Sequence, residues 1–220
     1  MSIIHRTTLA PTKLELLAEW LPTRTWYRAT DRAPQLAKAG GFRLDDPDGE
    51  VGIEFMVAAD TSGGDPVAYH VPLTYRGTPR DDAGDALIGT AEHGVLGKRW
   101  IYDGTRDPVL VAALVALIQG DAVPQAQGQS DTPDPTVRSH AASAVPLTPA
   151  AFTVAEGLDA TELLVTVGTA GQLVLSVPRV LQPVADEAVP VAVGQGYVTA
   201  TWQASGGQTV RGIIATAALR

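Results

Sequence analysis

The sequence predicts an α+β fold, in which a curved antiparallel sheet packs on two or three helices and is followed by a small all-β meander. Three observations predict it. Two segments have apolar residues at helical spacing and residues that mark both ends of a helix. Between these segments, apolar residues occupy every second position, as in strands. The last third of the chain also has strand patterns and no helical stripe.

The first predicted helix begins at a capping box, in which the Thr12 side chain accepts from the amide of residue 15 and Glu15 reaches back to the amide of residue 12. Apolar residues then form one stripe at helical spacing: Leu14, Leu17, Ala18 and Leu21. Pro22 ends the helix, because proline disfavours the helical conformation in the residue before it.

Apolar residues alternate along residues 51–58 and again along 67–75, on either side of the turn signal Ser62-Gly63-Gly64-Asp65-Pro66. This pattern predicts an antiparallel hairpin with one buried face. Pro72 has no amide hydrogen to give to a ladder, so we expect the second strand to lie at a sheet edge or to have a bulge there. Residues 86–93 and 98–102 extend the predicted sheet.

The second predicted helix has signals at both ends. Asp107 is an N-cap acceptor, Pro108 takes the first helical position, and Gly120 offers a stop. Residues 109–118 between them are apolar nearly all round, which indicates a helix that is covered on most sides. We expect it to be the central core helix.

The composition changes after the second helix. Residues 123–150 are rich in Pro, Gln and Ser and lack periodicity, which is typical of a linker. Later alternating segments predict strands near 163–167, 173–177, 198–202 and 210–214. The predicted organisation is therefore an α+β domain over residues 1–122, a linker over 123–150, and a β-meander domain over 151–220.

The composition excludes several classes of protein. Among 220 residues, 45% are hydrophobic and 18% are charged, so the chain should fold. The net charge of -8 argues against nucleic acid as a partner, and the absence of cysteine excludes disulfides and thiolate chemistry. The longest apolar run, 109–118, is about half of the roughly 20 residues that a membrane span needs. Because residues 1–7 do not resemble a secretory signal, we expect a cytoplasmic protein.

No spacing of chemically active residues predicts a catalytic, cofactor or metal site. The best metal candidate combines Glu92, His93 and Asp103 with His70, but polar residues on the wet face of a sheet are the ordinary interpretation. No serine lies at a strand-to-helix elbow, and the Gly194-Gln195-Gly196 segment precedes a strand pattern rather than a helix. We therefore assign no catalytic residue, cofactor or metal.

Aromatic and charged residues gather in two short segments, a mixture found in sugar-stacking sites, in protein interfaces and at ordinary core rims. Core and rim packing is the commonest of the three, and all three interpretations stay open. The candidate ligand or partner contacts are Trp26, Tyr27, His93, Arg99, Trp100, Tyr102 and Asp103.

The order of features resembles a known family. The segment Leu16-Leu17-Ala18-Glu19-Trp20-Leu21-Pro22 leads into Arg24-Thr25-Trp26-Tyr27, the paired strands follow, and Thr105-Arg106-Asp107-Pro108 opens the closing helix. Over residues 1–122 this order is similar to the N-terminal cap domain of actinobacterial maltokinases, which phosphorylate maltose with ATP between trehalose and α-glucan. Residues 38–47, 71–77 and 92–97 resemble short stand-alone cap-like proteins, loosely labelled 1,4-α-glucan branching proteins.

The sequence departs from the kinase part of that family. His140 is followed by Ala141 and Ala142 instead of the family's Gly-Asp, and no phenylalanine follows an aspartate as in the family's metal-binding motif. If residues 173–179 correspond to the strand that carries the phosphate-binding lysine, Ser176 stands in its place. Without these groups little phosphoryl transfer remains.

The resemblance therefore implies a non-catalytic binding or regulatory module of trehalose, maltose and α-glucan metabolism, whose partner is a protein of that pathway or a glycan. The alternative is a sugar kinase-related or α-glucan-acting enzyme with a non-standard active site that uses acids such as Glu92 and Asp103. A structural subunit of a larger assembly is a third hypothesis.

Overall fold

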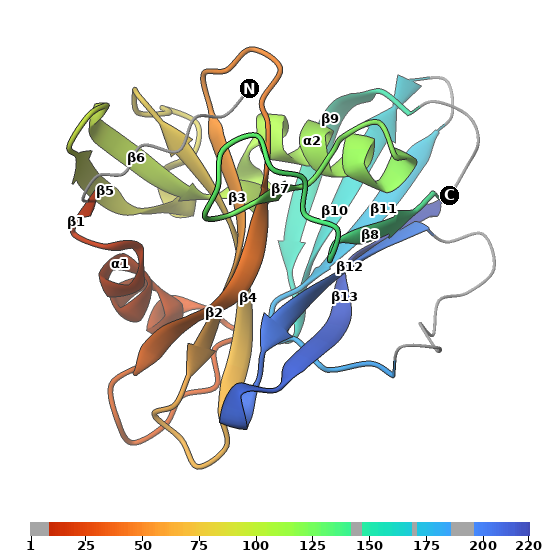
Figure 1. Cartoon of the computed structure of the whole chain (residues 1–220). Helices are drawn as coiled ribbons and strands as arrows, with labels where there is room; N and C mark the ends of the chain where they lie inside the picture. The colour runs from red at the N-terminus through yellow and green to blue at the C-terminus, as the bar shows by residue number, and fades with distance from the viewer. Residues whose placement is uncertain (1–8, 142–146, 169–170, 186–195) are drawn as a thin grey trace.

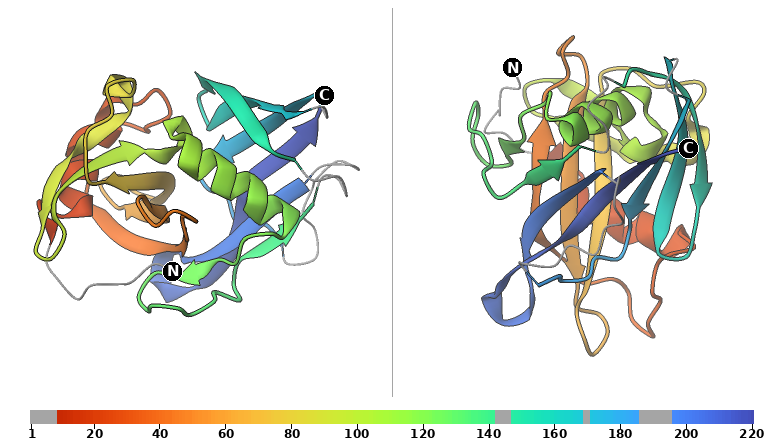
Figure 2. Two further views of the ribbon diagram at one scale, coloured as in Figure 1. Left: turned by 90° about the horizontal axis from the view of Figure 1, so that it is seen from above. Right: turned by 90° about the vertical axis from the view of Figure 1, so that its right-hand side faces the viewer.

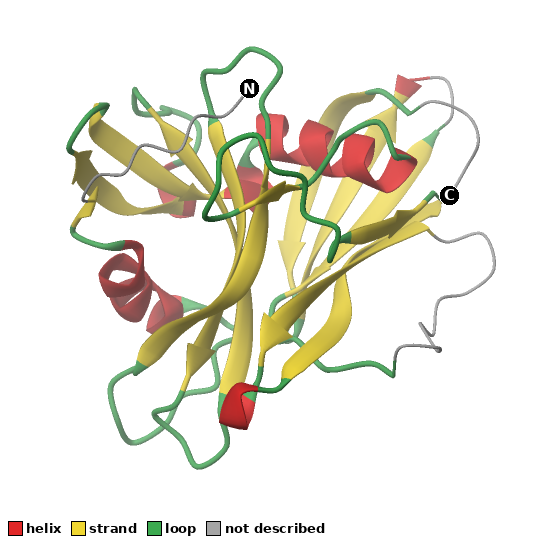
Figure 3. Ribbon diagram, in the orientation of Figure 1, coloured by secondary structure: helices red, strands yellow, loops and turns green. Residues whose placement is uncertain are grey.

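The protein is described by a computed structural model, which covers residues 9–141, 147–168, 171–185 and 196–220 (Figure 1). Over these residues thirteen strands form one antiparallel sheet, and there are two α-helices (Figure 3). The α+β prediction is therefore wrong, because the described chain is mostly β. The missed strands lie in glycine-containing or small-residue segments and in the predicted linker, where no clear alternation shows.

The elements have the following bounds: β1 Leu9–Ala10, α1 Lys13–Trp20, β2 Leu36–Leu44, β3 Gly52–Asp60, β4 Val67–Arg76, the 3₁₀ turn η2 Gly84–Ala86, β5 Leu87–His93, β6 Gly97–Asp103, the 3₁₀ turn η3 Gly104–Arg106, α2 Pro108–Gln119, β7 Gln125–Ala126, β8 Arg138–His140, β9 Pro149–Glu156, β10 Ala160–Val167, β11 Gln172–Pro178, β12 Gly196–Gln203 and β13 Thr209–Leu219. The strand order is β1-β5-β6-β4-β3-β2-β12-β13-β11-β10-β9.

Two contacts close the middle of this sheet into a ring. On one side Trp202 of β12 pairs with Gly40 of β2. On the other side β4 pairs with the segment after β11, where the His70 amide donates to the Arg179 carbonyl at 2.9 Å and the Leu181 amide donates to Ala68 at 2.8 Å. The sheet thus has two arms, one from β1 to β2 and the other from β12 to β9 in the strand order. Helix α2 lies across one opening between these two arms (Figure 2, left). The apolar core of this ring combines α2 with residues of both arms.

Both helices begin where the sequence predicts. The Thr12 and Glu15 capping box is present, and Asp107 accepts from the Val109 amide at 3.0 Å. Helix α2 ends at Gly120 in the left-handed conformation, and seven of its twelve residues are buried. Neither described helix has the length and the apolar character that crossing a membrane requires.

The predicted hairpin is present as β3 and β4, but the expectation of one buried face is wrong. Phe55 and Val57 of β3 join the core beneath α2, while Met56 joins a second cluster with Leu17 of α1. Both faces are covered because α1 packs on the side of the sheet away from α2 (Figure 1). The two strands therefore behave as buried central strands.

The expectation that the strand of Pro72 lies at a sheet edge or has a bulge is also wrong. Strand β4 lies between β3 and β6, and its pairing with β3 has no register shift. His70 donates its amide away from β3, to Arg179. Because the amides of successive residues in a strand point to opposite sides, Pro72, two residues after His70, turns its nitrogen to the same side as the His70 amide. On that side of β4, Tyr69 pairs with Val180 before Pro72, and Leu73 pairs with Asp103 of β6 after it. Pro72 lies in the gap between these two pairings, so no ladder hydrogen bond is lost.

The last third of the chain contains the predicted strands in an order other than a meander. Strand β13 lies between β11 and β12, so the final strand inserts into the middle of this arm. Within the predicted linker, β7 pairs with β2 and β8 pairs with β12. The boundaries 1–122, 123–150 and 151–220 stay a prediction, although residues on both sides share one core.

We predict that Gly41→Ala strongly destabilises the protein. Gly41 has φ 125°, and an added Cβ would lie 2.1 Å from the Phe55 carbonyl oxygen. The strained backbone and the clash should together lower the free energy of unfolding by about 3 kcal/mol or more, as measured by urea denaturation. The control is Gly49→Ala, at φ 72° with no atom near the added Cβ. Equal losses in the two variants would contradict the importance of close packing at Gly41.

Candidate functional site

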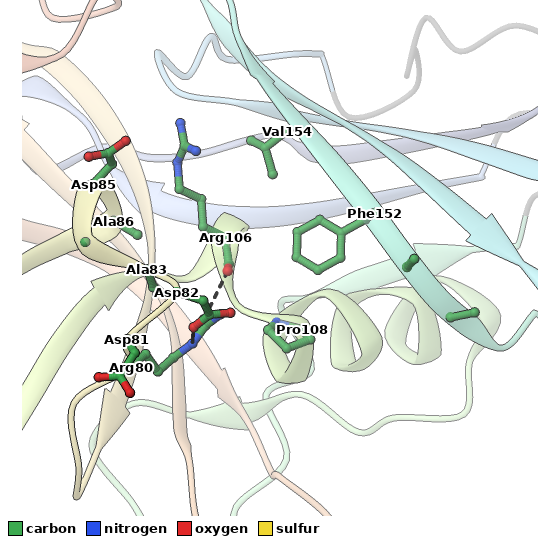
Figure 4. Close-up of a pocket in the computed structure, with 13 residues that line it drawn as sticks. Arg80, Asp81, Asp82, Ala83, Asp85, Ala86, Arg106, Pro108, Phe152 and Val154 are labelled. Carbon is green, nitrogen blue, oxygen red and sulfur yellow. Dashed lines mark hydrogen bonds and ion pairs between the residues drawn. The ribbon is translucent and has the colours of Figure 1, made fainter.

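A cavity of about 600 Å³ opens between β9 and the loop of residues 80–86 (Figure 4). Arg106 of η3 and Pro108 of α2 complete its lining. We call this cavity the β9 groove. Its lining residues are Arg80, Asp81, Asp82, Ala83, Gly84, Asp85, Ala86, Arg106, Pro108, Ala150, Ala151, Phe152 and Val154.

The loop wall of the β9 groove is held in place by Arg80. The Arg80 amide donates to the Tyr102 hydroxyl at 2.8 Å, and its guanidinium donates to the Arg106 carbonyl at 3.0 Å. The guanidinium also binds the Asp82 carboxylate at 2.9 Å, and this hydrogen bond lowers the pKa of Asp82. The charge of Arg80 is thus neutralised within the protein.

The remaining charges of the groove are unbalanced. Arg106 donates to Glu156 at 3.2 Å, so this cation also has an acidic partner. Asp81 and Asp85 are exposed, and no hydrogen bond or ion pair connects either carboxylate to another residue in the described ranges. The two aspartates leave the loop wall negative.

The opposite wall is β9, the last strand of the sheet order, where Phe152 and Val154 supply apolar surface. Both side chains are half-buried and pack against the core beneath α2. In Figure 4 they face the charged loop across η3 and the start of α2. The β9 groove therefore combines an apolar strand with an acidic loop.

A fully buried arginine positions η3, which lies between the two walls. Arg179 donates to the Asp103 carboxylate at 2.5 Å, to the Thr105 hydroxyl at 2.9 Å and to the Thr161 hydroxyl at 2.7 Å. Its guanidinium carbon also lies 5.1 Å from the centre of the Trp26 ring. Because Asp103 caps η3, Thr105 lies within η3 and Thr161 lies near the start of β10, these bonds join the two arms of the sheet behind the groove.

His70 is buried beside this ion pair. Its Nδ1 lies 3.0 Å from the Pro178 carbonyl oxygen, which makes Nδ1 the protonated nitrogen when the ring is neutral. Burial lowers the pKa of His70 to about 3, and the nearby Arg179 charge acts in the same direction. His70 is therefore a neutral core side chain at ordinary pH.

Asp107 anchors the start of α2 next to the groove. Its carboxylate accepts from the Arg76 guanidinium at 2.7 and 2.8 Å as well as from the Val109 amide. Burial acts to raise the pKa of Asp107, but the hydrogen bonds from Arg76 and Val109 outweigh burial, so the pKa is lowered. The N-cap therefore stays ionised, which suits a helix N-terminus.

The structure separates the seven candidate contacts of the sequence analysis. Trp26 and Asp103 meet Arg179 in the core, and the Tyr102 hydroxyl supports the Arg80 loop. Tyr27 packs on Tyr69, as Trp26 does, and donates to Asp60 at 3.0 Å; burial, together with this hydrogen bond, raises the pKa of Tyr27 to about 12.

The remaining three candidates lie in the β5–β6 hairpin. His93 accepts from the Leu96 amide at 3.0 Å, Arg99 donates to the Leu96 carbonyl, and Trp100 stacks under Lys98 at 5.2 Å. The seven residues thus do not form one site, and their role as ligand or partner contacts stays a prediction.

The acids considered for metal binding and for acid–base chemistry do not converge. Glu92 is opposite Lys98 near the start of β6, whereas Asp103 is at its end, opposite Leu73. Among the described residues no group of three or more His, Cys, Asp or Glu side chains is arranged to hold a metal ion.

Sequence reasoning missed the residues of the groove and Arg179. Arg80, Asp81 and Asp85 belong to a polar turn without a motif, and Phe152 belongs to a segment of small residues. Arg179 carried a usable signal, since it is the only charged residue between Gln172 and Gln182. A lone charge in such an apolar segment indicates a buried partner.

Residues 20–107 match the family model of the maltokinase N-terminal cap domain. This confirms the resemblance over the part of the chain from the end of α1 to the N-cap of α2. A search of curated proteins finds no match. The matched range contains the loop wall of the groove and Arg106, whereas β9 lies outside it.

We predict that Asp103→Leu costs about 3–5 kcal/mol of unfolding free energy, because it leaves the Arg179 charge buried without a partner. The double variant Asp103→Leu/Arg179→Met should lose less than Asp103→Leu alone, since no buried charge remains. Urea denaturation of both variants and of Arg179→Met gives the coupling energy. Additive losses would contradict the coupling.

We predict that His70 makes the protein less stable in acid. The unfolded chain takes up a proton near pH 6.5, whereas the folded chain resists protonation until about pH 3, so stability is fully present above pH 6.5 and is lost as the pH falls toward 3. The steepest loss is about 1 kcal/mol per pH unit. His70→Gln should flatten this slope in denaturation measured below pH 6.5. His140→Gln, at an exposed position, should keep it.

Proposed function

We propose that this chain is a cytoplasmic, non-catalytic binding or regulatory module of trehalose, maltose and α-glucan metabolism. It recognises a protein or glycan of that metabolism at the β9 groove. The observation that carries the proposal is the match of residues 20–107 to the maltokinase N-terminal cap domain. The matched residues supply one wall of the groove and β9 supplies the other, so the groove lies between this cap-like unit and a later part of the chain.

The groove has the size and chemistry of a recognition site. Its volume of about 600 Å³ is within the usual range of ligand pockets. Phe152 and Val154 provide apolar contact area, while the exposed carboxylates of Asp81 and Asp85 are available as hydrogen-bond acceptors.

The geometry of Glu92 and Asp103 supports binding over the enzymatic alternative. Asp103 lies five residues along β6 from Lys98, the partner of Glu92, which is about 16 Å at the rise of a strand. Paired carboxylates in glycoside hydrolysis lie about 5–9.5 Å apart. Asp103 is moreover already held by Arg179.

The test combines a binding assay with an activity assay. Calorimetry with maltose, trehalose, maltoheptaose, glycogen and a purified maltokinase should give saturable binding to at least one of them. The chain incubated with ATP, Mg²⁺ and maltose, or with glycogen, should give no product above a boiled control. Turnover by the chain, or the absence of binding to all five, would overturn the proposal.

A pair of variants on one strand tests the position of the site. Ala151 lines the β9 groove and Ala155 does not, although both are exposed on β9. Ala151→Arg should weaken the binding about tenfold or more by filling the groove, whereas Ala155→Arg should leave it unchanged. Equal effects would place the binding elsewhere.

A further inference from the structure

The outer edge of β9 has unused backbone hydrogen-bonding groups. The Gly157 amide donates to the Ala160 carbonyl at 2.8 Å and closes the β9–β10 hairpin. Because hydrogen-bonded and non-hydrogen-bonded pairs alternate in an antiparallel ladder, the backbone groups of Glu156, Val154 and Phe152 point away from β10. No backbone segment within the described ranges pairs with this edge.

The β9 groove lies beside these groups, since Phe152 and Val154 are among its lining residues. Residues 150–155 contain no charge and no proline, and the register with β10 shifts only near Pro149. Native proteins commonly protect an edge strand with lysine, proline or a bulge. Most of β9 lacks these devices, so its edge is suited to accept another strand.

The charges around the groove select the kind of strand. Arg80 is paired with Asp82, and Arg106 is paired with Glu156, so Asp81 and Asp85 dominate the wall that faces β9. A second copy of this chain would bring the same two carboxylates and a net charge of -8. A strand with cationic side chains complements the groove, whereas a second copy is repelled.

We propose that an extended, lysine- or arginine-bearing segment of a protein partner adds to the sheet along β9. Its main chain pairs with the outward groups of Phe152, Val154 and Glu156, and its cationic side chains reach Asp81 and Asp85. This mode of recognition obtains affinity from main-chain hydrogen bonds and specificity from alternate side chains. The inference rests on the proposed function and names the chemistry of the partner at the same groove.

The binding test uses a labelled short peptide that alternates valine and threonine and carries lysines at alternate positions. Fluorescence anisotropy with the whole chain should show saturable binding that weakens as salt is added. A peptide with glutamates in place of the lysines should bind at least about tenfold more weakly. A lysine peptide with alternate amides N-methylated should also lose about tenfold, because it cannot pair with a strand edge.

Variants of the chain separate the contribution of the main-chain hydrogen bonds from that of the acidic side chains. Val154→Pro removes an outward amide without touching the ladder to β10, and it should weaken the lysine peptide about tenfold. Ala155→Thr, on the same strand but outside the groove lining, keeps every outward amide and should bind normally. Asp81→Asn/Asp85→Asn should weaken binding about fivefold at low salt, whereas Asp31→Asn/Asp65→Asn, with the same charge change at exposed positions outside the groove, should not.

The inference is overturned if the lysine peptide does not bind, if the glutamate peptide binds equally well, or if Val154→Pro binds normally while its circular dichroism spectrum is native. Self-association of the wild-type chain that Val154→Pro abolishes would assign the edge to a second copy and would also overturn it. If peptides fail while Ala151→Arg still blocks a glycan or a maltokinase, the proposed function stands and only the strand-addition mode is lost.

Discussion

The ion pair between Arg179 and Asp103 is the interaction on which the arrangement of the two arms depends. A buried arginine is costly unless its charge is paired, and here Asp103 pairs the charge while the Thr105 and Thr161 hydroxyls accept two further hydrogen bonds. Asp103 and Thr105 belong to the first half of the chain, and Thr161 and Arg179 to the second. The bonds from Nε and Nη2 of Arg179 form only when the arms meet in one geometry, so the ion pair specifies how the arms join.

The way in which the two arms join produces both a closed core and an exposed sheet edge at β9. The ring of strands and α2 bury the apolar interior, which removes the edges of the central strands. The sheet nevertheless continues beyond the ring and ends at β9, next to the loop held by Arg80. The β9 groove is thus supported by a rigid core without being part of it, an arrangement that allows recognition without a loss of stability.

Features that depend on residues close together in the sequence were predicted more accurately than features that depend on distant residues. The caps of α1 and α2 were predictable because Thr12 and Asp107 bond to amides within three residues of themselves. Strands β3 and β4 were predictable from alternation, but whether one face or both were buried was not, because α1 covers the second face from a distant part of the sequence. The groove was not predictable, since its walls are about seventy residues apart and neither carries a motif.

The sequence by itself determined the ends of both helices, the central hairpin, the strands β10 to β13 and the resemblance of residues 20–107 to the maltokinase cap domain, because each depends on neighbouring residues or on an ordered pattern along the chain. Only the tertiary structure decided the strand order, the place of Pro72, the burial of Arg179 and the existence of the β9 groove. These features depend on long-range pairing and on the matching of buried charges, whose partners periodicity cannot identify.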